Sequence, residues 1–432
     1  MSFQQGLSGL NATSKSLDVI GNNIANANTY GAKISRAEFS DMYAAALNGA
    51  GVNNVGIGVN LAAVSQQFTQ GNITTTGNAM DLAINGAGFF QVTDGVNPTM
   101  YSRNGQFKVD REGYIVNNEK LQLMGYPADG TGTIQPGLAQ PLRLPTAGIA
   151  PKVTSDMEIE FNLDADSAVT APASTVTPQI DFTNKKTYNN ATSVTIYDSK
   201  GQDVALSYYY QKSANDTWNV YVTANGEPVH TDASGNPVAW QTLAFDNTTG
   251  KLSSPSPADA LDLTIENELI ITDPDTGAET SRIVVPLATT VDFSGATQYD
   301  QTFGVTNLTQ NGYAAGQLTS IAIEADGIVL ARYSNGQSKP AGQLELANFR
   351  NPQGLQPMGG NVWASTYASG DPVIGVPSEG NMGVIQSGAL EESNIDLTGE
   401  LVNMITAQRI YQANAQTIKT QDQVMQTLVN MR

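Results

Sequence analysis

The sequence predicts a mainly β fold with α-helical termini. Two nested β domains, sandwich-like or barrel-like, would adjoin a coiled-coil domain formed by both chain ends. Apolar residues recur at heptad spacing near both ends of the chain. Short alternating strands, separated by Asn-Gly and Asp-Gly turns, fill most of the sequence between those ends. A Pro- and Gly-rich stretch, residues 126–151, divides the strands into two groups and marks a domain boundary.

Residues 393–432 have the pattern of a coiled-coil helix. Apolar positions alternate four and three residues apart, interrupted by the polar Gln408 and Asp422. They are Leu397, Leu401, Met404, Tyr411, Ile418, Met425 and Val429, with the small residue Ala415 among them. The other face carries Gln, Asn and Thr instead of a Glu/Lys mixture, so we expect protein on all sides of this helix. Taken alone, the pattern also fits a C-terminal helix docked on its own domain.

Residues 1–30 carry the same signal. Phe3, Leu10, Leu17 and Ile24 recur every seven residues, and Leu7 fills the intermediate position. Neither terminal helix has an apolar stripe wide enough for stability alone in water. We infer that the two helices pair with each other as an inner domain and that their outer faces pack against neighbouring copies. The chain would then polymerise.

Residues 31–70 and 372–392 are predicted to be extended connectors. The first helix should end near residues 26–28, and Thr29-Tyr30-Gly31 is typical of a turn. A short helical patch is expected over residues 39–47, followed by Gly-interrupted extended chain.

An inner β domain is predicted over residues 71–147 and 293–371. Asn85-Gly86 lies between two apolar runs, which is the strongest short hairpin signal. The dipeptide recurs at Asn104, Asn225, Asn311 and Asn335, and Asp-Gly occurs at Asp94, Asp129 and Asp326. Residues 148–292 show further alternating strands and are predicted to be an inserted, outer β domain.

Composition excludes several classes of function. A formal net charge of −19 and a pI near 4.3 disfavour nucleic acid and anionic membrane surfaces as partners. The chain has no Cys, which excludes disulfides, thiolate metal sites and cysteine catalysis. The N-terminus lacks a basic region followed by an apolar one, and no apolar run approaches the ~18 residues of a membrane span. We therefore expect neither a cleavable signal peptide nor membrane insertion.

Residues for catalysis or cofactor binding are scarce. His230 is the only histidine, so no His-based triad or two-His zinc site can form. Gly56-Ile57-Gly58 and Gly86-Ala87-Gly88 lack the third glycine of a dinucleotide loop. Residues 273–277 only weakly match a calcium loop, because no Glu follows at its twelfth position. We predict no enzyme activity, cofactor or metal, although a carboxylate pair of the glycosidase type stays open.

The N-terminal stretch SGLNATSKSLDVIGNNIANANTYGAK resembles the signature of the bacterial flagellar rod/hook axial protein family. Its most specific part is ANANTYGAK, residues 25–33, which contains a family turn motif of Ala25, Asn26, Thr29, Gly31 and Lys33. Relatives often have an aromatic before that lysine, where this chain has Ala32, so we expect the local packing to differ there. Other segments resemble the hook members closely: DLAINGAGFFQV, YSRNGQFKVDREGYIVN, NGYAAGQLTSIAIEADG, NVWASTYASG and GALEESNIDLTGELVNMITAQRIYQANAQTIK.

The resemblance implies a subunit that self-assembles into a curved helical tube outside the cell, the flagellar hook. Such a tube acts as a universal joint that passes motor torque to the filament. Its implied partners are further copies of itself, the flagellar rod on the proximal side, the hook-filament junction protein on the distal side, the hook assembly cap and the flagellar type III export apparatus. The alternatives are a distal rod subunit, which usually lacks a large insert, and a secreted β-rich adhesin or carbohydrate-active enzyme.

Overall fold

The computed structural model describes residues 2–43, 56–145, 147–172, 177–256, 261–272 and 279–430. The chain forms two compact units. Unit 1 comprises Met1–Thr146, Thr319–Arg332 and Ser338–Arg432, and unit 2 comprises Ala147–Leu318 and Tyr333–Gln337. Both chain ends therefore belong to the same unit. No helix in the described ranges is long and apolar enough to cross a membrane.

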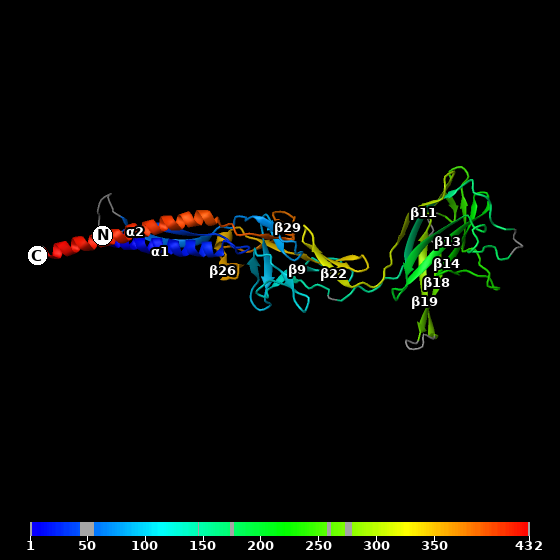
Figure 1. The fold of residues 1–432 in the computed structure, drawn as a ribbon, viewed down its shortest axis with the longest axis horizontal. Helices are drawn as coiled ribbons and strands as arrows, with labels where there is room; N and C mark the ends of the chain where they lie inside the picture. Colours follow the sequence, from blue (N-terminus) through cyan, green and yellow to red (C-terminus); the bar gives the residue numbers. More distant parts are fainter. Residues whose placement is uncertain are drawn as a thin grey trace. The chain divides into compact units, whose positions relative to one another are not determined.

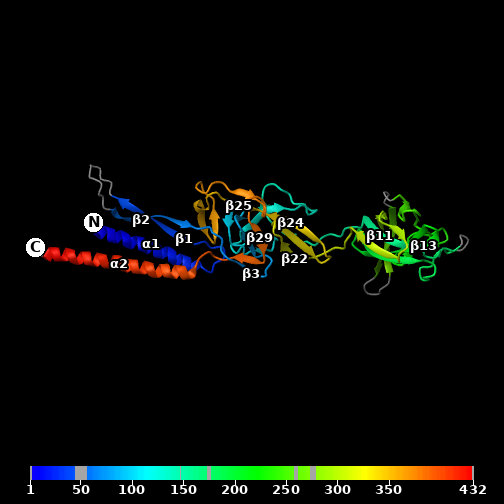
Figure 2. The ribbon, with the colours of Figure 1, turned by 90° about the horizontal axis from the view of Figure 1, so that it is seen from above.

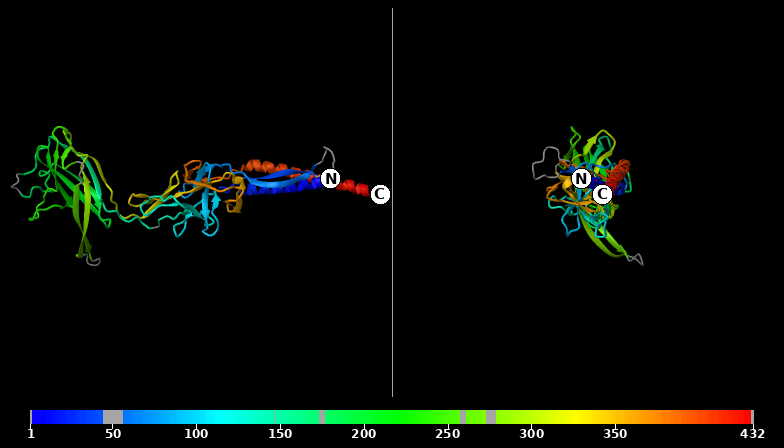
Figure 3. Two further views of the ribbon diagram at one scale, coloured as in Figure 1. Left: turned by 180° about the vertical axis from the view of Figure 1, so that it is seen from behind. Right: turned by 90° about the vertical axis from the view of Figure 1, so that its left-hand side faces the viewer.

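Two long helices and a β-hairpin form one end of unit 1. Helices α1 (Ser2–Asn26) and α2 (Leu397–Asn430) lie side by side in every view (Figure 1, Figure 2 and Figure 3). Strands β1 (Ser35–Tyr43) and β2 (Gly56–Gln66) form an antiparallel hairpin that runs along α1 (Figure 2). The mainly β fold with helical, mutually contacting termini is confirmed. The helical patch expected over residues 39–47 is wrong where it is described, because residues 39–43 pair with β2; residues 44–47 lie outside the described ranges.

The rest of unit 1 is β structure. Its main sheet has the strand order β22 (Leu318–Ile323), β23 (Ile328–Tyr333), β24 (Ser338–Leu344), β9 (Gln122–Pro127), β5 (Phe89–Thr93), β6 (Met100–Ser102), β27 (Val362–Ala364), β26 (Gln356–Gly359). Side pairings add β7 (Lys108–Val109), β8 (Ile115–Val116), β10 (Gln140–Pro141), β25 (Leu346–Asn348) and β28 (Val373–Gly375). Two small ladders pair β4 (Leu82–Asn85) with β29 (Val384–Ser387) and β3 (Ile73–Thr75) with β30 (Ala389–Glu391). A 3-10 turn, η1, covers Pro352–Gly354.

Strand β5 is the centre of this sheet, because both of its faces are buried. Phe90 and Val92 pack in one apolar cluster with Leu82, Ile115 and Leu123. Phe89 faces a second, aromatic cluster that contains Tyr101, Phe349, Leu355 and Trp363, with Phe68 packed against it. Phe68 comes directly after the β1–β2 hairpin, so the second cluster attaches the connector to the sheet.

Some of the predicted hairpins are wrong. Asn85-Gly86 joins β4 to β5, yet β4 pairs with β29 and β5 pairs with β6, β9 and β25. Gly86 has φ 114°, outside a two-residue hairpin turn, and its backbone passes close to Gly383. Strands next to Asn104 and Asn311 likewise pair elsewhere. Hairpins do form at Asn225 and Asn335, where the flanking strands pair with each other.

Unit 2 is built from two facing sheets. One has the order β18 (Leu261–Thr272), β19 (Glu279–Asp292), β11 (Asp156–Asp164), β20 (Thr297–Tyr299), with β21 (Gly304–Gln310) also on β11. The other has the order β12 (Asn190–Tyr197), β13 (Asp203–Ala214), β14 (Thr217–Ala224), β16 (Gln241–Phe245), β17 (Leu252–Ser254), with β15 (Glu227–Pro228) on β14. β11 runs parallel to β19 and β20, whereas most other described pairs are antiparallel.

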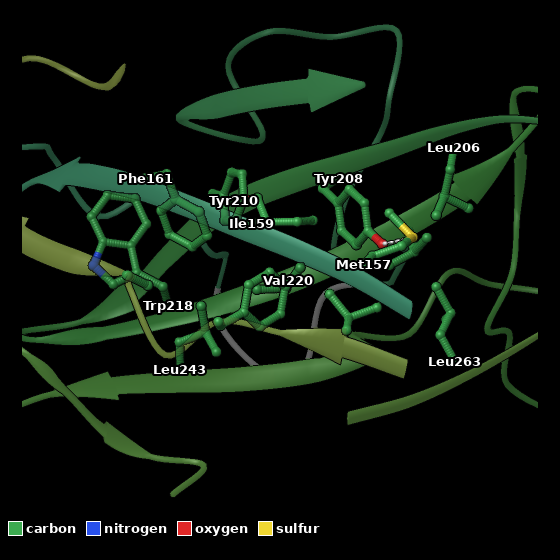
Figure 4. Packing of buried hydrophobic residues seen from close by; sticks show 14 of the residues in the cluster. Met157, Ile159, Phe161, Leu206, Tyr208, Tyr210, Trp218, Val220, Leu243 and Leu263 are labelled. Carbon is green, nitrogen blue, oxygen red and sulfur yellow. Dashed lines mark hydrogen bonds between the residues drawn. The ribbon is translucent and has the colours of Figure 1, made fainter. Parts of the chain in front are cut away.

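Side chains from both sheets interdigitate in one apolar core (Figure 4). Phe161 comes from β11, Tyr208 and Tyr210 from β13, and Trp218 from β14; all are buried. We expected the insert to end at residue 292, but β20 and β21 follow that residue and pair with β11. Phe293 and Ala296 are buried in the same core, which holds the returning chain to unit 2.

Candidate functional site: the terminal helices and their junction

Helices α1 and α2 are antiparallel and approach each other closely through small residues. A Cβ atom added at Gly6 would lie 3.1 Å from Ile418 Cγ1, and one at Gly9 would lie 2.9 Å from Asn414 Nδ2. Ala407 of α2 is also buried, although α2 has exposed residues on both sides of it. Small side chains allow two helix backbones to come near each other, at the expense of buried apolar area.

A different face of α1 is bound to the β1–β2 hairpin. Gln5 donates from Nε2 to the carbonyl of Gly56 at 2.6 Å. The Ser8 hydroxyl donates to the Val59 carbonyl at 2.6 Å and accepts from the Val59 N–H at 2.8 Å. The Ser8 hydroxyl thus pairs with both the N–H and the carbonyl of Val59. These hydrogen bonds fix the register of the helix against the hairpin.

The predicted seam residues do not form the closest part of this contact. Leu10, Leu17, Ile24, Met404 and Ile418 are half-buried, and Ile418 is the one that meets Gly6. The others whose side chains are described are exposed: Leu7, Leu397, Leu401, Tyr411, Met425 and Val429. The Phe3 side chain lies outside the described part of the structure. By helical geometry, Leu10 and Leu17 project from a face that adjoins the one carrying Gly6 and Gly9.

Helix α2 also continues past the first residues of α1 (Figure 1). Gly6 is level with Ile418, and the antiparallel direction leaves no part of α1 opposite the last turns of α2. Val424, Met425 and Val429 are exposed on those turns. The terminal helices thus present apolar side chains that nothing in the described chain covers.

A buried ionic cluster joins the helices to the inner sheet. We call it the junction cluster; it consists of Lys33, Arg103 and Glu391. Lys33 Nζ donates to Glu391 Oε1 at 2.7 Å, and Arg103 Nη1 donates to Glu391 Oε2 at 3.2 Å. The Lys33 and Glu391 side chains are 0% exposed. Lys33 follows α1 in the chain and Glu391 precedes α2, so one carboxylate holds both helix ends.

Neighbouring backbone groups complete the junction cluster. The N–H of Gly71 donates to Glu391 Oε1 at 2.9 Å, and Lys33 Nζ donates to the Thr69 carbonyl at 2.8 Å. Arg103 reaches the Gly86 carbonyl at 2.9 Å through Nη2. Burial lowers the pKa of Lys33, while the charge of Glu391 and the hydrogen bond to it oppose that shift. A buried carboxylate with this many charge-assisted donors fixes four chain segments at one point.

Two asparagines extend the junction toward the helices. Asn394 accepts from the Ile34 N–H at 2.8 Å and donates to the Gln67 carbonyl at 2.9 Å. Asn23 exchanges two hydrogen bonds with the backbone of Ser35 and donates to Glu400 Oε2 at 3.2 Å. These two asparagines therefore connect three parts of the chain: the segment that follows α1, the end of the β1–β2 hairpin and the start of α2.

The predicted turn motif contributes unequally to this junction. Lys33 is central to it, and Gly31 has φ 72° and donates its N–H to the Glu391 carbonyl at 2.9 Å. A Cβ at Gly31 would lie 2.6 Å from the Asn104 nitrogen, so only glycine fits. Asn26 and Thr29 form the turn itself through a 3.0 Å backbone bond, and Ala25 is exposed. Ala32, beside Lys33, is buried.

Sequence reasoning missed Arg103, Glu391, Asn394 and the small residues of the helix contact. A Gly-x-x-Gly-x-x-x-Thr pattern from Gly6 to Thr13 could have indicated the close helix contact. Among the described residues no group of three or more His, Asp or Glu is placed to hold a metal. His230 belongs to unit 2, where partial burial lowers its pKa. The weak calcium-loop match at 273–277 lies outside the described residues.

Four families known from flagella match the chain. The flagella basal body rod protein family matches residues 3–33, and the FlgE/F/G D1 domain of flagellar hook proteins matches residues 83–202. The FlaE D2 domain of flagellar basal body proteins matches residues 162–313. The C-terminal family of the basal body rod proteins FlgEFG matches residues 386–431.

Curated relatives match from end to end. The chain is 43% identical over 438 residues to the flagellar hook protein FlgE of Escherichia coli, and 41% identical over 437 residues to that of Salmonella typhimurium; both alignments cover 100% of each chain. The flagellar hook protein FlgE of Borreliella burgdorferi is 31% identical over 454 residues, covering 100% of this chain and 99% of its own. The crystal structure of Helicobacter pylori flagellar hook protein FlgE2 resembles the fold with a TM-score of 0.52. That alignment has 16% identity and covers 74% of this chain and 100% of the other.

Proposed function

The chain belongs to the flagellar hook protein FlgE family, and from that premise we propose that its copies polymerise into a curved helical tube that passes motor torque to the filament. The chain is a structural subunit of the flagellar hook. Contacts between copies that do not close on themselves generate open helical assemblies. The tube would be a universal joint in which subunits slide past one another as it bends.

The observation that carries the proposal is the exposed apolar surface of the terminal helices. Leu401, Tyr411 and Met425 are exposed on α2, and Leu7 is exposed on α1. Large apolar patches left open on a soluble chain mark surfaces that another protein covers. In the tube, helices of neighbouring copies would cover these side chains, so that the predicted seam residues act between subunits as well as within one.

We propose a four-part organisation for the subunit in the tube. Residues 1–30 with 393–432 form the inner tube, 31–70 with 372–392 form the connector, 71–147 with 319–371 form the inner β domain, and 148–318 form the outer one, in place of the end at residue 292 that the sequence predicted. The pairing of β20 and β21 with β11 favours a later end for the outer domain, near residue 318.

The junction cluster is proposed to transmit load between the tube-forming helices and the inner β domain. Lys33, Arg103 and Glu391 hold both helix ends and the main sheet of unit 1 through charge-assisted hydrogen bonds. The side chains of the cluster are buried, so water cannot replace a hydrogen bond that is broken there. A rotation of the helices would therefore have to move the sheet as well.

The further partners of this subunit are those of a hook protein. We propose that the tube contacts the flagellar rod at its proximal end and the hook-filament junction protein at its distal end, outside the cell. Assembly would require the hook cap and the flagellar type III export apparatus. We assign the subunit a structural role without catalysis.

Polymerisation of the purified chain tests the proposal. Negative-stain microscopy should show short curved tubes after concentration of the wild-type protein. Leu401→Asp should abolish them, because a charge in a desolvated helix contact costs several kcal/mol per subunit. Leu401→Met, which keeps an apolar side chain, should assemble as the wild type does. A stable wild-type monomer, or normal tubes from Leu401→Asp, would refute the proposed contact.

A further inference from the structure

Tyr367 is a fully exposed aromatic residue in unit 1. It lies between β27 and β28, and its accessibility reaches 105% of the reference value. A side chain this exposed makes no packing contact with its own chain. Aromatic side chains carry a large apolar surface, and they supply much of the binding energy in protein interfaces.

Hydrogen bonds hold the loop that carries Tyr367. Thr366 donates its hydroxyl to the Gly354 carbonyl at 2.6 Å, and its N–H donates to Ser369 Oγ at 2.9 Å. The buried Ser369 hydroxyl returns a bond to the Thr366 carbonyl at 2.8 Å, and Asn351 Nδ2 donates to the Ala368 carbonyl at 3.0 Å. These bonds fix the residues on both sides of Tyr367. A loop backbone that is fixed in advance loses less conformational entropy when a residue on it binds.

The surroundings of Tyr367 suit contact with another copy of the same chain. Residues 351–370 contain no charged side chain, although the chain carries a net charge of −19. Copies with the same net charge repel one another, so a contact between copies is least opposed where the two surfaces add no net charge. A partner of opposite charge would instead be expected to bind a charged surface.

A cleft of about 430 Å³ in the same unit can receive an aromatic ring. Phe349, Ile374 and Met382 contribute apolar walls, and one basic and one acidic residue, Arg350 and Glu379, also line the cleft. Ile374 and its neighbour Val373 on β28 are 49% and 54% exposed. Apolar residues on a strand at the edge of its ladder normally need a cover.

We propose that Tyr367 of one copy packs into this cleft of a neighbouring copy when the chain polymerises. The inference rests on the polymerisation proposed above and names one of its contacts. The ring would lie against Ile374 and Met382, with the Arg350 guanidinium positioned for a cation–π contact. In a growing polymer each copy would give its Tyr367 to one neighbour and receive that of another, whereas a mutual exchange between two copies would close the pair. The first, heterologous arrangement propagates instead of closing.

Engineered cysteines test the contact directly, since the chain has no Cys of its own. Tyr367→Cys and Ile374→Cys subunits are mixed in equal amounts, polymerised and oxidised mildly. Disulfide-linked dimers are expected in the tubes and not in the unpolymerised mixture. As a matched control, Val96→Cys replaces an 89% exposed residue on another loop of unit 1 and should give no dimers with Ile374→Cys.

Four results would overturn the inference. Tubes without a disulfide between positions 367 and 374 would exclude this contact alone and leave the proposed function intact. Equal linkage by Val96→Cys would show that the cross-linking is unspecific. Linkage before polymerisation would indicate a closed pair instead of a propagating contact. If the wild type forms no tubes, the proposed function fails and the inference fails with it.

A second measurement tests how much the Tyr367 side chain contributes to polymerisation. Tyr367→Ala should raise the protein concentration needed for polymerisation by about tenfold or more, as for a central interface residue. Tyr367→Phe keeps the ring and should stay near the wild-type value. Because Tyr367 is fully exposed, both variants should fold with wild-type thermal stability. Equal concentrations for all three proteins would contradict the contact.

Discussion

Unit 2 and the terminal helices differ in where their large apolar side chains lie. In unit 2, Trp218, Tyr208 and Tyr210 are 0% exposed in a core built from two facing sheets. In α2, Val402, Met425 and Val429 are 58%, 56% and 72% exposed. One region has buried its apolar surface within the chain, whereas the other still has apolar surface to bury. This difference predicts that unit 2 is stable by itself and that the helices depend on neighbouring copies.

Magnitudes support this difference. Full burial of a large aliphatic side chain is worth about 1.5–3 kcal/mol, and fixing one residue of backbone costs roughly 1–2 kcal/mol. The close contact between α1 and α2 uses Gly6 and Gly9, which bury little apolar area. Helix ordering is therefore poorly compensated until further surface is buried by assembly.

Removing a large core side chain from unit 2 should show the largest effect. Trp218→Ala is expected to lower the free energy of unfolding of unit 2 by about 3–5 kcal/mol, because it leaves a cavity between the sheets. Denaturant unfolding followed by hydrogen exchange at β13 and β14 measures it. Val238→Ala, at a half-exposed position of the same unit, is the control and should stay within about 0.5 kcal/mol. Similar losses in both variants would mean that unit 2 has no independent core.

The junction cluster should show a comparable effect in unit 1. Glu391→Gln leaves two buried cations without their carboxylate, which is expected to cost about 3–5 kcal/mol. Lys33→Met removes one cation and keeps the Glu391 to Arg103 pair, so its cost should be smaller. Thermal unfolding monitored by Trp363 fluorescence, with the tryptophans of unit 2 replaced by phenylalanine, compares the two. A larger loss of stability in Lys33→Met than in Glu391→Gln would show that Glu391 is not the centre of the cluster.

A smaller, pH-dependent effect is expected at Glu345. Its side chain is buried, Tyr126 donates to Oε1 at 3.0 Å, and burial raises the pKa of its carboxyl group. The folded-state pKa then exceeds the unfolded value of about 4.3, so the contribution to stability is present below that value and is lost as the pH rises through the folded pKa. Glu345→Gln should remove this decline when unfolding is measured from pH 4 to pH 7. An unchanged pH profile would argue that the carboxyl titrates normally.

The sequence was informative wherever a periodic signal is local. Heptads predicted both helices, and alternation predicted β12, β13 and β14 in unit 2. Hairpin signals succeeded at Asn225 and Asn335, where the neighbouring strands pair with each other. At Asn85 the signal failed, because β4 takes its partner β29 from a distant part of the chain.

The junction cluster could not be predicted for a related reason. Lys33 and Glu391 are separated by 358 positions, and no local pattern indicates that they meet. The helix contact was missed because it depends on small residues, which hydrophobic periodicity does not register. The role of the exposed seam residues between subunits stays a prediction.

Hydrogen exchange of the free subunit, compared with that of the tube, tests the central claim most directly. In the free subunit, amides of residues 1–30 and 395–432 should exchange orders of magnitude faster than those of β13 and β14 in unit 2, because local openings there cost little. In the tube, both sets should be slow. Slow exchange of the terminal helices already in the free subunit would show that they fold before assembly, and it would contradict the dependence on neighbouring copies.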